Sequence, residues 1–113
     1  MTDLKNDINV LISALSDKKG LDIKALQVGE VSIISDYFII VTGTNTSQLD
    51  ALRDIAEEKM KDMDYKLKNR EGRSEGGWIL LDYGTVIIHI FSEEMREFYD
   101  LDYTWRDVPQ LAY

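Results

Sequence analysis

Apolar residues recur at helical spacing in two stretches of the chain. The first runs from about Asp3 to Asp17, where apolar side chains at offsets of four, seven, eight and eleven residues form one stripe of a helix. These side chains are Leu4, Ile8, Leu11, Ile12 and Leu15. We expect Lys18, Lys19 and Gly20 to end this helix, because lysine complements the negative end of the helix dipole and glycine adopts the left-handed conformation found at helix ends.

A second amphipathic helix is predicted after residues 43–47, which combine turn formers with helix-capping residues. Its apolar positions are Leu49, Leu52, Ile55, Ala56, Met60 and Met63. A short third helix is predicted from Ser92 through Phe98. Serine is a favourable N-cap, and Glu93 and Glu94 stand where the helix dipole stabilises negative charge.

Strands are predicted between and after these helices. Residues 37–42 form a continuous aromatic and β-branched run, which is typical of a central strand covered on both faces. Residues 23–28 predict an earlier strand that ends in a turn at Gly29 and Glu30, and residues 65–68 predict a strand after the second helix, completing a βαβ-like unit. The polar residues 71–77 predict a loop, and residues 78–81 and 86–91 predict a hairpin around residues 82–85.

These elements predict an α/β or α+β fold, in which a single mixed sheet of about five strands is flanked by helices. A chain of 113 residues supplies one core, and its single proline, Pro109, lies in the tail and interrupts no predicted element. We therefore expect residues 1–113 to form one domain.

Composition narrows the class of partner. With 21 acidic and 13 basic residues the chain has a net charge of −8, which disfavours direct contact with nucleic acid and favours a basic partner. The alternative is that the charge only keeps the protein soluble. The chain has no cysteine, no apolar run long enough to span a membrane and no secretory signal at its start, so the expected compartment is the cytoplasm.

Two blocks of the sequence resemble the ribosome-silencing factor family, also called Iojap-related. The first block is SDYFIIVTG at residues 35–43, followed by Asn45 and Gln48. The second block contains Glu71-Gly72, GWILLDYG at residues 77–84, VIIHIF at residues 86–91, Arg96, Phe98-Tyr99, Leu101 and Trp105. The resemblance covers nearly the whole chain from Leu4 to Trp105, and its polar and aromatic matches occur in the family's order and spacing.

This resemblance implies a nucleotidyltransferase-like fold with a mixed sheet flanked by helices. It also implies that the protein binds the large ribosomal subunit through large-subunit protein fourteen and blocks joining of the small subunit, which lowers translation when nutrients are scarce. Organellar relatives act in assembly of the large subunit, so an assembly factor is the main alternative. The sequence leaves open whether the free protein forms a homodimer.

Four residues are expected to serve the fold. Asp36 precedes the central strand, where its carboxylate is expected to accept hydrogen bonds from neighbouring amides or to cap a turn. Gly43 belongs to the turn after that strand. We expect His89 to pack between strand and helix with both ring nitrogens hydrogen-bonded, and Arg96 to pair with a carboxylate that fixes the last helix.

A metal-dependent nucleotidyltransferase is the second alternative. Gly43-Thr44 resembles the glycine–hydroxyl turn of those enzymes, and two Asp-x-Asp pairs occur, at residues 62–64 and 100–102. Neither pair falls on a predicted strand beside that turn, and one histidine without cysteine leaves few other catalytic arrangements. We therefore expect no catalytic residue, no cofactor and no metal.

The candidate partner surface lies in the aromatic C-terminal half of the chain. Tryptophan and tyrosine are favoured anchors of protein interfaces, and the carboxylates interleaved with them suit a basic ribosomal protein. The predicted surface comprises Trp78, Asp82, Tyr83, Glu93, Glu94, Tyr99, Asp102 and Trp105. The alternative is that these residues are core aromatics and solvated charges.

Overall fold

The structure is a computed structural model that describes residues 3–31, 33 and 35–111. Its centre is a five-stranded mixed sheet in the order β1-β2-β5-β4-β3, in which β2 and β5 are parallel and the other neighbours are antiparallel. The strands are β1 (Leu21–Gln27), β2 (Tyr37–Gly43), β3 (Asn69–Arg73), β4 (Trp78–Asp82) and β5 (Val86–Ser92). The predicted fold class is therefore confirmed, while residues 1, 2, 112 and 113 of the predicted domain lie outside the described residues.

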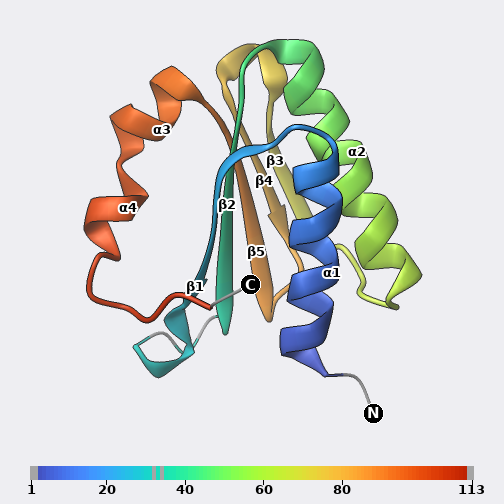
Figure 1. Cartoon of the computed structure of the whole chain (residues 1–113), viewed down its shortest axis with the longest axis vertical. Coiled ribbons are helices and arrows are strands. Elements are labelled where there is room, and N and C mark those ends of the chain that lie inside the picture. Colours follow the sequence, from blue (N-terminus) through green and yellow to red (C-terminus); the bar gives the residue numbers. More distant parts are fainter. Residues whose placement is uncertain (1–2, 32, 34, 112–113) are drawn as a thin grey trace.

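Helices lie on both sides of this sheet (Figure 1). The helices are α1 (Leu4–Asp17), α2 (Thr46–Asp62), α3 (Glu93–Tyr99) and α4 (Leu101–Thr104), with two short 3-10 helices at Val28–Glu30 and Ser74–Gly76. Figure 1 shows α1 and α2 on one face and α3 and α4 on the other. Among the described residues, no helix is long and apolar enough to cross a membrane.

Local capping explains where the predicted helices begin. The Asp3 carboxylate accepts from the amides of Lys5 and Asn6 at the start of α1, and Asn45 accepts from the amide of Gln48 at 2.8 Å at the start of α2. Ser92 caps α3 through the amide of Met95, which confirms the predicted third helix. The additional helix α4 has little apolar periodicity in its four residues and was not predicted.

The central strand β2 separates two apolar cores. Ile39 and Val41 pack with buried residues of α1 and α2, whereas Ile40 and the half-buried Phe38 pack with Phe91 of β5 and residues of α3, α4 and the tail. Alternate side chains of β2 therefore enter opposite cores. This arrangement confirms the prediction of a central strand covered on both faces.

The prediction was wrong along the edge of the sheet. Residues 65–68 are not a strand; the Tyr65 amide donates to the Met60 carbonyl and continues the end of α2. The strand β3 follows at Asn69–Arg73 and overlaps the start of residues 71–77, which were predicted as a loop, and all five residues of this strand are exposed. An exposed edge strand needs no apolar face, so its sequence lacks the pattern by which strands are predicted.

The end of α1 also differs from the prediction. Lys19, and not Gly20, adopts the left-handed conformation, with φ 66°. Gly20 is needed for another reason, because a Cβ atom there would lie 2.7 Å from Cγ2 of Val41 and 2.9 Å from the carbonyl oxygen of Leu15. The glycine therefore allows the chain to pass closely over the sheet as it leaves the helix.

Candidate functional site

Aromatic rings gather on the sheet face that α3 and α4 cover only in part. Trp78 at the start of β4 is half-buried, and its ring centroid lies 4.8 Å from that of Tyr99 on α3 and 5.9 Å from that of Phe91. Tyr99 is 43% exposed, and the preceding residue of α3, Phe98, is 73% exposed. A half-buried tryptophan beside exposed aromatic rings is typical of a protein-binding surface.

His89 lies beneath Trp78 and is buried, with 6% of its surface exposed. Its Nδ1 accepts a hydrogen bond of 3.3 Å from the indole Nε1–H of Trp78. Its Nε2 is buried and has no hydrogen-bond partner among the described residues, so the expectation that both ring nitrogens are satisfied is wrong. Burial in these apolar surroundings lowers the pKa of His89 from 6.5 to about 4.

Arg96 joins α3 to the sheet and to α4. Its guanidinium donates two hydrogen bonds to the Asp102 carboxylate, at 2.8 and 3.0 Å, and one to Oγ1 of Thr42 on β2 at 2.9 Å. Lys24 approaches the same carboxylate at 2.8 Å, and Asp22 lies 3.5 Å from the guanidinium. Hydrogen bonds from Arg96 and Lys24 hold the pKa of Asp102 well below its ordinary value. Arg96 thus has the carboxylate partner that we expected from the sequence.

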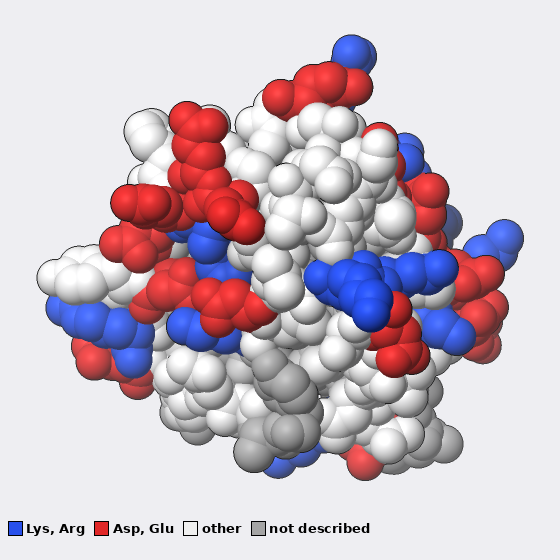
Figure 2. Space-filling model, turned by 45° about the horizontal axis from the view of Figure 1, so that its top comes forward, with Lys and Arg blue, Asp and Glu red and all other residues white. Residues whose placement is uncertain are grey.

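An acidic recess of about 330 Å³ opens beside this ion pair. Its polar wall consists of Thr42, Asp22, Glu93, Arg96, Glu97, Asp100 and Asp102. Glu93, Glu97 and Asp100 form no ion pair with any described residue, so the recess carries uncompensated negative charge. Figure 2 shows acidic side chains gathered on the α3–α4 side of this face, with basic side chains between them.

The structure brings together only part of the predicted partner surface. Trp78 and Tyr99 are in contact, Trp105 packs near them through Phe38 at 5.3 Å between centroids, and Glu93 and Asp102 line the adjoining recess. Glu94 is exposed on α3. The Asp102 carboxylate is bound by Arg96 and Lys24, which leaves it less free to meet a partner than Glu93.

Two members of the predicted surface do not belong with the others. Tyr83 is 6% exposed and lies in the core under α1 and α2, on the other face of the sheet from Trp78. Asp82 stands at the opposite end of β4 from Trp78, where its carboxylate accepts from the Gly84 amide at 2.8 Å and shapes the hairpin turn. Proximity in sequence was misleading for both residues.

Several residues at this site were missed by the sequence analysis. Phe38, Phe98, Asp22 and Glu97 belong to the aromatic group or the recess. Alternation along β2 would have indicated Phe38, since it lies on the face opposite Ile39. No sequence signal indicated Asp22, which reaches Arg96 from a β-bulge in β1, where its φ is 50°.

The two remaining residues that we expected to serve the fold behave differently from each other. Gly43 ends β2 where α2 approaches closely, and a Cβ atom there would lie 2.8 Å from Cδ2 of Leu49. Asp36 is exposed, and its carboxylate accepts no hydrogen bond from a described residue, so the expected side-chain cap is not found among the described residues. Its backbone pairs instead, with the Asp36 amide donating to Thr85 and its carbonyl accepting from Gly29.

The Asp-x-Asp pairs lie far from a metal-binding arrangement. Asp62 ends α2 and Asp64 follows it in a left-handed conformation, while Asp102 is engaged by Arg96. Within the described parts of the chain, no group of three or more His, Cys, Asp or Glu side chains is arranged to hold a metal ion.

The described residues thus form an α/β fold around one mixed sheet, and on one face of that sheet aromatic rings lie beside an acidic recess. The family model described as "Ribosomal silencing factor during starvation" matches residues 2–112, and the chain belongs to this family. It is 31% identical over 105 residues to the ribosomal silencing factor RsfS of Bacillus subtilis, covering 93% of this chain and 89% of that protein.

Further relatives extend the comparison. The mouse protein "Mitochondrial assembly of ribosomal large subunit protein 1" is 32% identical over 104 residues, which are 89% of this chain and 46% of that protein. The crystal structure of a Chromobacterium violaceum protein superposes with a TM-score of 0.87 at 28% identity, covering 99% of this chain and 94% of that one.

Proposed function

We propose that this domain binds the large ribosomal subunit through large-subunit protein fourteen and prevents the small subunit from joining. The action is steric, and the domain makes and breaks no bond. The observation that supports it most is the contact between Trp78 and the exposed Tyr99 beside a recess of unpaired carboxylates, in a chain of the ribosomal silencing family. A basic ribosomal protein complements this surface in charge, and the cytoplasm is where the two would meet.

The two parts of the surface have different roles in this proposal. Unpaired carboxylates such as Glu93 and Glu97 speed and orient the encounter, because charges at a rim act over distance. Trp78 and Tyr99 slow dissociation, because aromatic anchors that become fully desolvated contribute most of the binding energy.

An assembly factor is the second candidate function. It is favoured by the name of the mouse relative, which refers to assembly of the ribosomal large subunit. The two functions use the same partner and differ in which particle is bound: a silencing factor binds finished large subunits, whereas an assembly factor prefers their precursors.

Co-sedimentation with purified ribosomal particles tests the proposal. The wild-type chain should pellet with mature large subunits and not with small subunits, and should lose binding as salt is raised. A preference for precursor particles over mature subunits would favour the assembly role. Absence from both large-subunit pellets at moderate salt would contradict both functions.

A further inference from the structure

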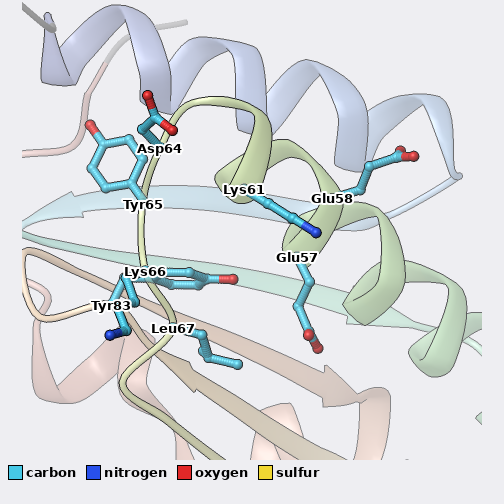
Figure 3. A pocket seen from close by; sticks show the side chains of 8 residues that line it. All are labelled: Glu57, Glu58, Lys61, Asp64, Tyr65, Lys66, Leu67 and Tyr83. Atoms are coloured by element: carbon cyan, nitrogen blue, oxygen red, sulfur yellow. The ribbon is translucent and has the colours of Figure 1, made fainter.

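A second cavity lies away from the aromatic face, on the side of the sheet that α1 and α2 cover. Its volume is about 660 Å³, within the usual range for small-molecule sites. It lies between the last turns of α2, the connecting residues 64–67 and the turn that joins β4 to β5 (Figure 3). Glu57 and Lys61 line it from the helix, Leu67 from the connection and Tyr83 from the turn.

The Tyr83 side chain is the unusual feature of this cavity. Only 6% of the Tyr83 surface is exposed, yet its hydroxyl has no hydrogen-bond partner among the described residues. Figure 3 shows this hydroxyl directed into the cavity, toward the space between Lys61 and Glu57. Burial and the nearby Glu57 carboxylate raise the pKa of Tyr83 to about 12, so the phenol keeps its proton at neutral pH and can donate it.

The other polar groups differ in whether they are already engaged. Both oxygens of Glu57 accept from Arg70, at 3.1 and 2.5 Å, and the Tyr65 hydroxyl donates to Asp7 at 2.7 Å. The Lys61 ammonium forms no ion pair with any residue that the structure describes, and Figure 3 shows it pointing to the same side as the Tyr83 hydroxyl. The Tyr83 hydroxyl and the Lys61 ammonium therefore both offer donors to the same part of the cavity. The Asp64 carboxylate and the Lys66 ammonium also line the cavity, but in Figure 3 they lie apart from the Tyr83 hydroxyl.

We propose that this cavity binds a small organic anion. Its carboxylate or phosphate group accepts hydrogen bonds from the Tyr83 hydroxyl and the Lys61 ammonium, and its apolar part lies against Leu67 and the Tyr83 ring. The Glu57 carboxylate does not oppose an anion strongly, because Arg70 neutralises it. The Glu58 carboxylate also lines the cavity, but Figure 3 shows it pointing away from the Tyr83 hydroxyl.

Amide chemical shifts of the whole ¹⁵N-labelled chain provide the test, with three probes of similar shape. Benzoate carries a carboxylate, phenyl phosphate carries a phosphate, and benzylammonium carries the opposite charge. Saturable shift changes at Lys61, Leu67 and Tyr83 are expected with one or both anions at millimolar concentrations and not with benzylammonium. Stronger binding of benzylammonium, or no saturable change with either anion, would overturn the proposal.

Variants separate this site from general effects on folding. Tyr83→Phe keeps the ring and removes the donor, and should weaken anion binding about tenfold, which is the usual effect of one hydrogen bond to a charged group. Lys61 is exposed, so Lys61→Gln should leave the protein folded and should weaken anion binding severalfold. Tyr65→Phe is the matched control, because its hydroxyl is already used by Asp7, so binding should stay within about twofold.

Unchanged binding in both Tyr83→Phe and Lys61→Gln would refute the assigned contacts. The site lies on the other face of the sheet from Trp78 and Tyr99, so its test is independent of ribosome binding. Each proposal can therefore fail without the other.

Discussion

Trp78 donates its indole Nε1–H to Nδ1 of His89 across 3.3 Å, and the two ring planes lie within 11° of parallel. Because Nδ1 accepts, the imidazole is neutral and carries its proton on Nε2, which is buried and has no hydrogen-bond partner in the part of the chain that the structure describes. In a protonated imidazole both nitrogens are donors, so Nδ1 cannot accept the hydrogen bond from Trp78. The protonation state of His89 is therefore linked to the position of Trp78 on the proposed partner surface.

The first prediction concerns acid. The pKa of His89 falls from 6.5 to about 4 on folding, so below 6.5 the unfolded chain binds a proton that the folded chain does not. The part of the unfolding free energy that depends on neutral His89 is fully present above pH 6.5 and is lost as the pH falls toward 4. Between about pH 7 and pH 5 this loss amounts to roughly 2 kcal/mol.

Urea unfolding at the two pH values measures this loss. The His89→Gln variant does not titrate there and should have a flatter stability profile than the wild type by about the same amount. Parallel profiles for the two proteins would show that His89 is not the group responsible.

The second prediction concerns the clamp between α3 and the sheet. Arg96→Met removes the bidentate hydrogen bonds to Asp102 and the hydrogen bond to Thr42. This variant should lose about 3 kcal/mol of unfolding free energy. The estimate lies at the low end for buried pairs because the Asp102 side chain is 26% exposed. Arg53→Met, which removes ion pairs on the surface of α2, should cost less than about 1 kcal/mol. Equal losses in denaturant unfolding would contradict this account.

The third prediction compares two glycines at the end of the β3–β4 hairpin. Gly72 has φ 82°, and a Cβ atom there would lie 2.0 Å from the Trp78 carbonyl oxygen. Gly72→Ala should therefore destabilise the fold by at least about 2 kcal/mol. Gly76 has nothing within 4 Å of such an atom, and Gly76→Ala should be nearly neutral. Thermal melts of both variants give the comparison, and a Gly72→Ala variant as stable as the wild type would disprove the close approach.

The fourth prediction divides the proposed partner surface into anchor and rim. Tyr99→Ala should speed dissociation from large subunits and lower the binding free energy by about 2 kcal/mol, because Tyr99 is the proposed anchor of the complex. Charge reversal of Glu93 and Glu94 should instead lower the association rate and weaken its dependence on salt. Surface-plasmon kinetics distinguish these effects.

Tyr103→Ala is the control for the anchor, because Tyr103 is also exposed but was not assigned to the surface. Thermal melts must accompany the kinetics, since a buried tyrosine would cost about 3 to 5 kcal/mol of stability when truncated. Folded variants with unchanged ribosome binding would move the interface elsewhere on the domain.

Apolar periodicity was sufficient for the elements that face a core. The stripe of α1 and the continuous run of β2 both identify buried surfaces, and the structure buries them as predicted. The edge strand β3 lacked such a signal, because Asn69–Arg73 is exposed throughout and contains the left-handed Gly72. Its place in the sheet depends on pairing with β4, a long-range contact that composition does not encode.

The candidate site was predictable only in part. Strand alternation indicated that His89 faces away from Val86, Ile88 and Ile90, as the structure has it. The same rule, continued into the turn, separates Trp78 from Tyr83, which are five positions apart and lie on opposite faces. Tyr83 was nevertheless grouped with Trp78, because neighbouring aromatic residues were counted without regard to the face of the sheet. The ion pair of Arg96 with Asp102 depends on the left-handed Asp100 between α3 and α4, which no pattern indicated.

Light scattering during association of purified ribosomal subunits is the direct test of whether the bound protein blocks joining of the small subunit. Large subunits are first incubated with excess protein at moderate salt, and small subunits are then added. We expect slower and less complete association with the wild-type chain, and recovery toward the uninhibited signal with Tyr99→Ala. An association signal that is unchanged by excess wild-type protein, although the protein is folded and bound to the large subunits, would contradict the steric mechanism.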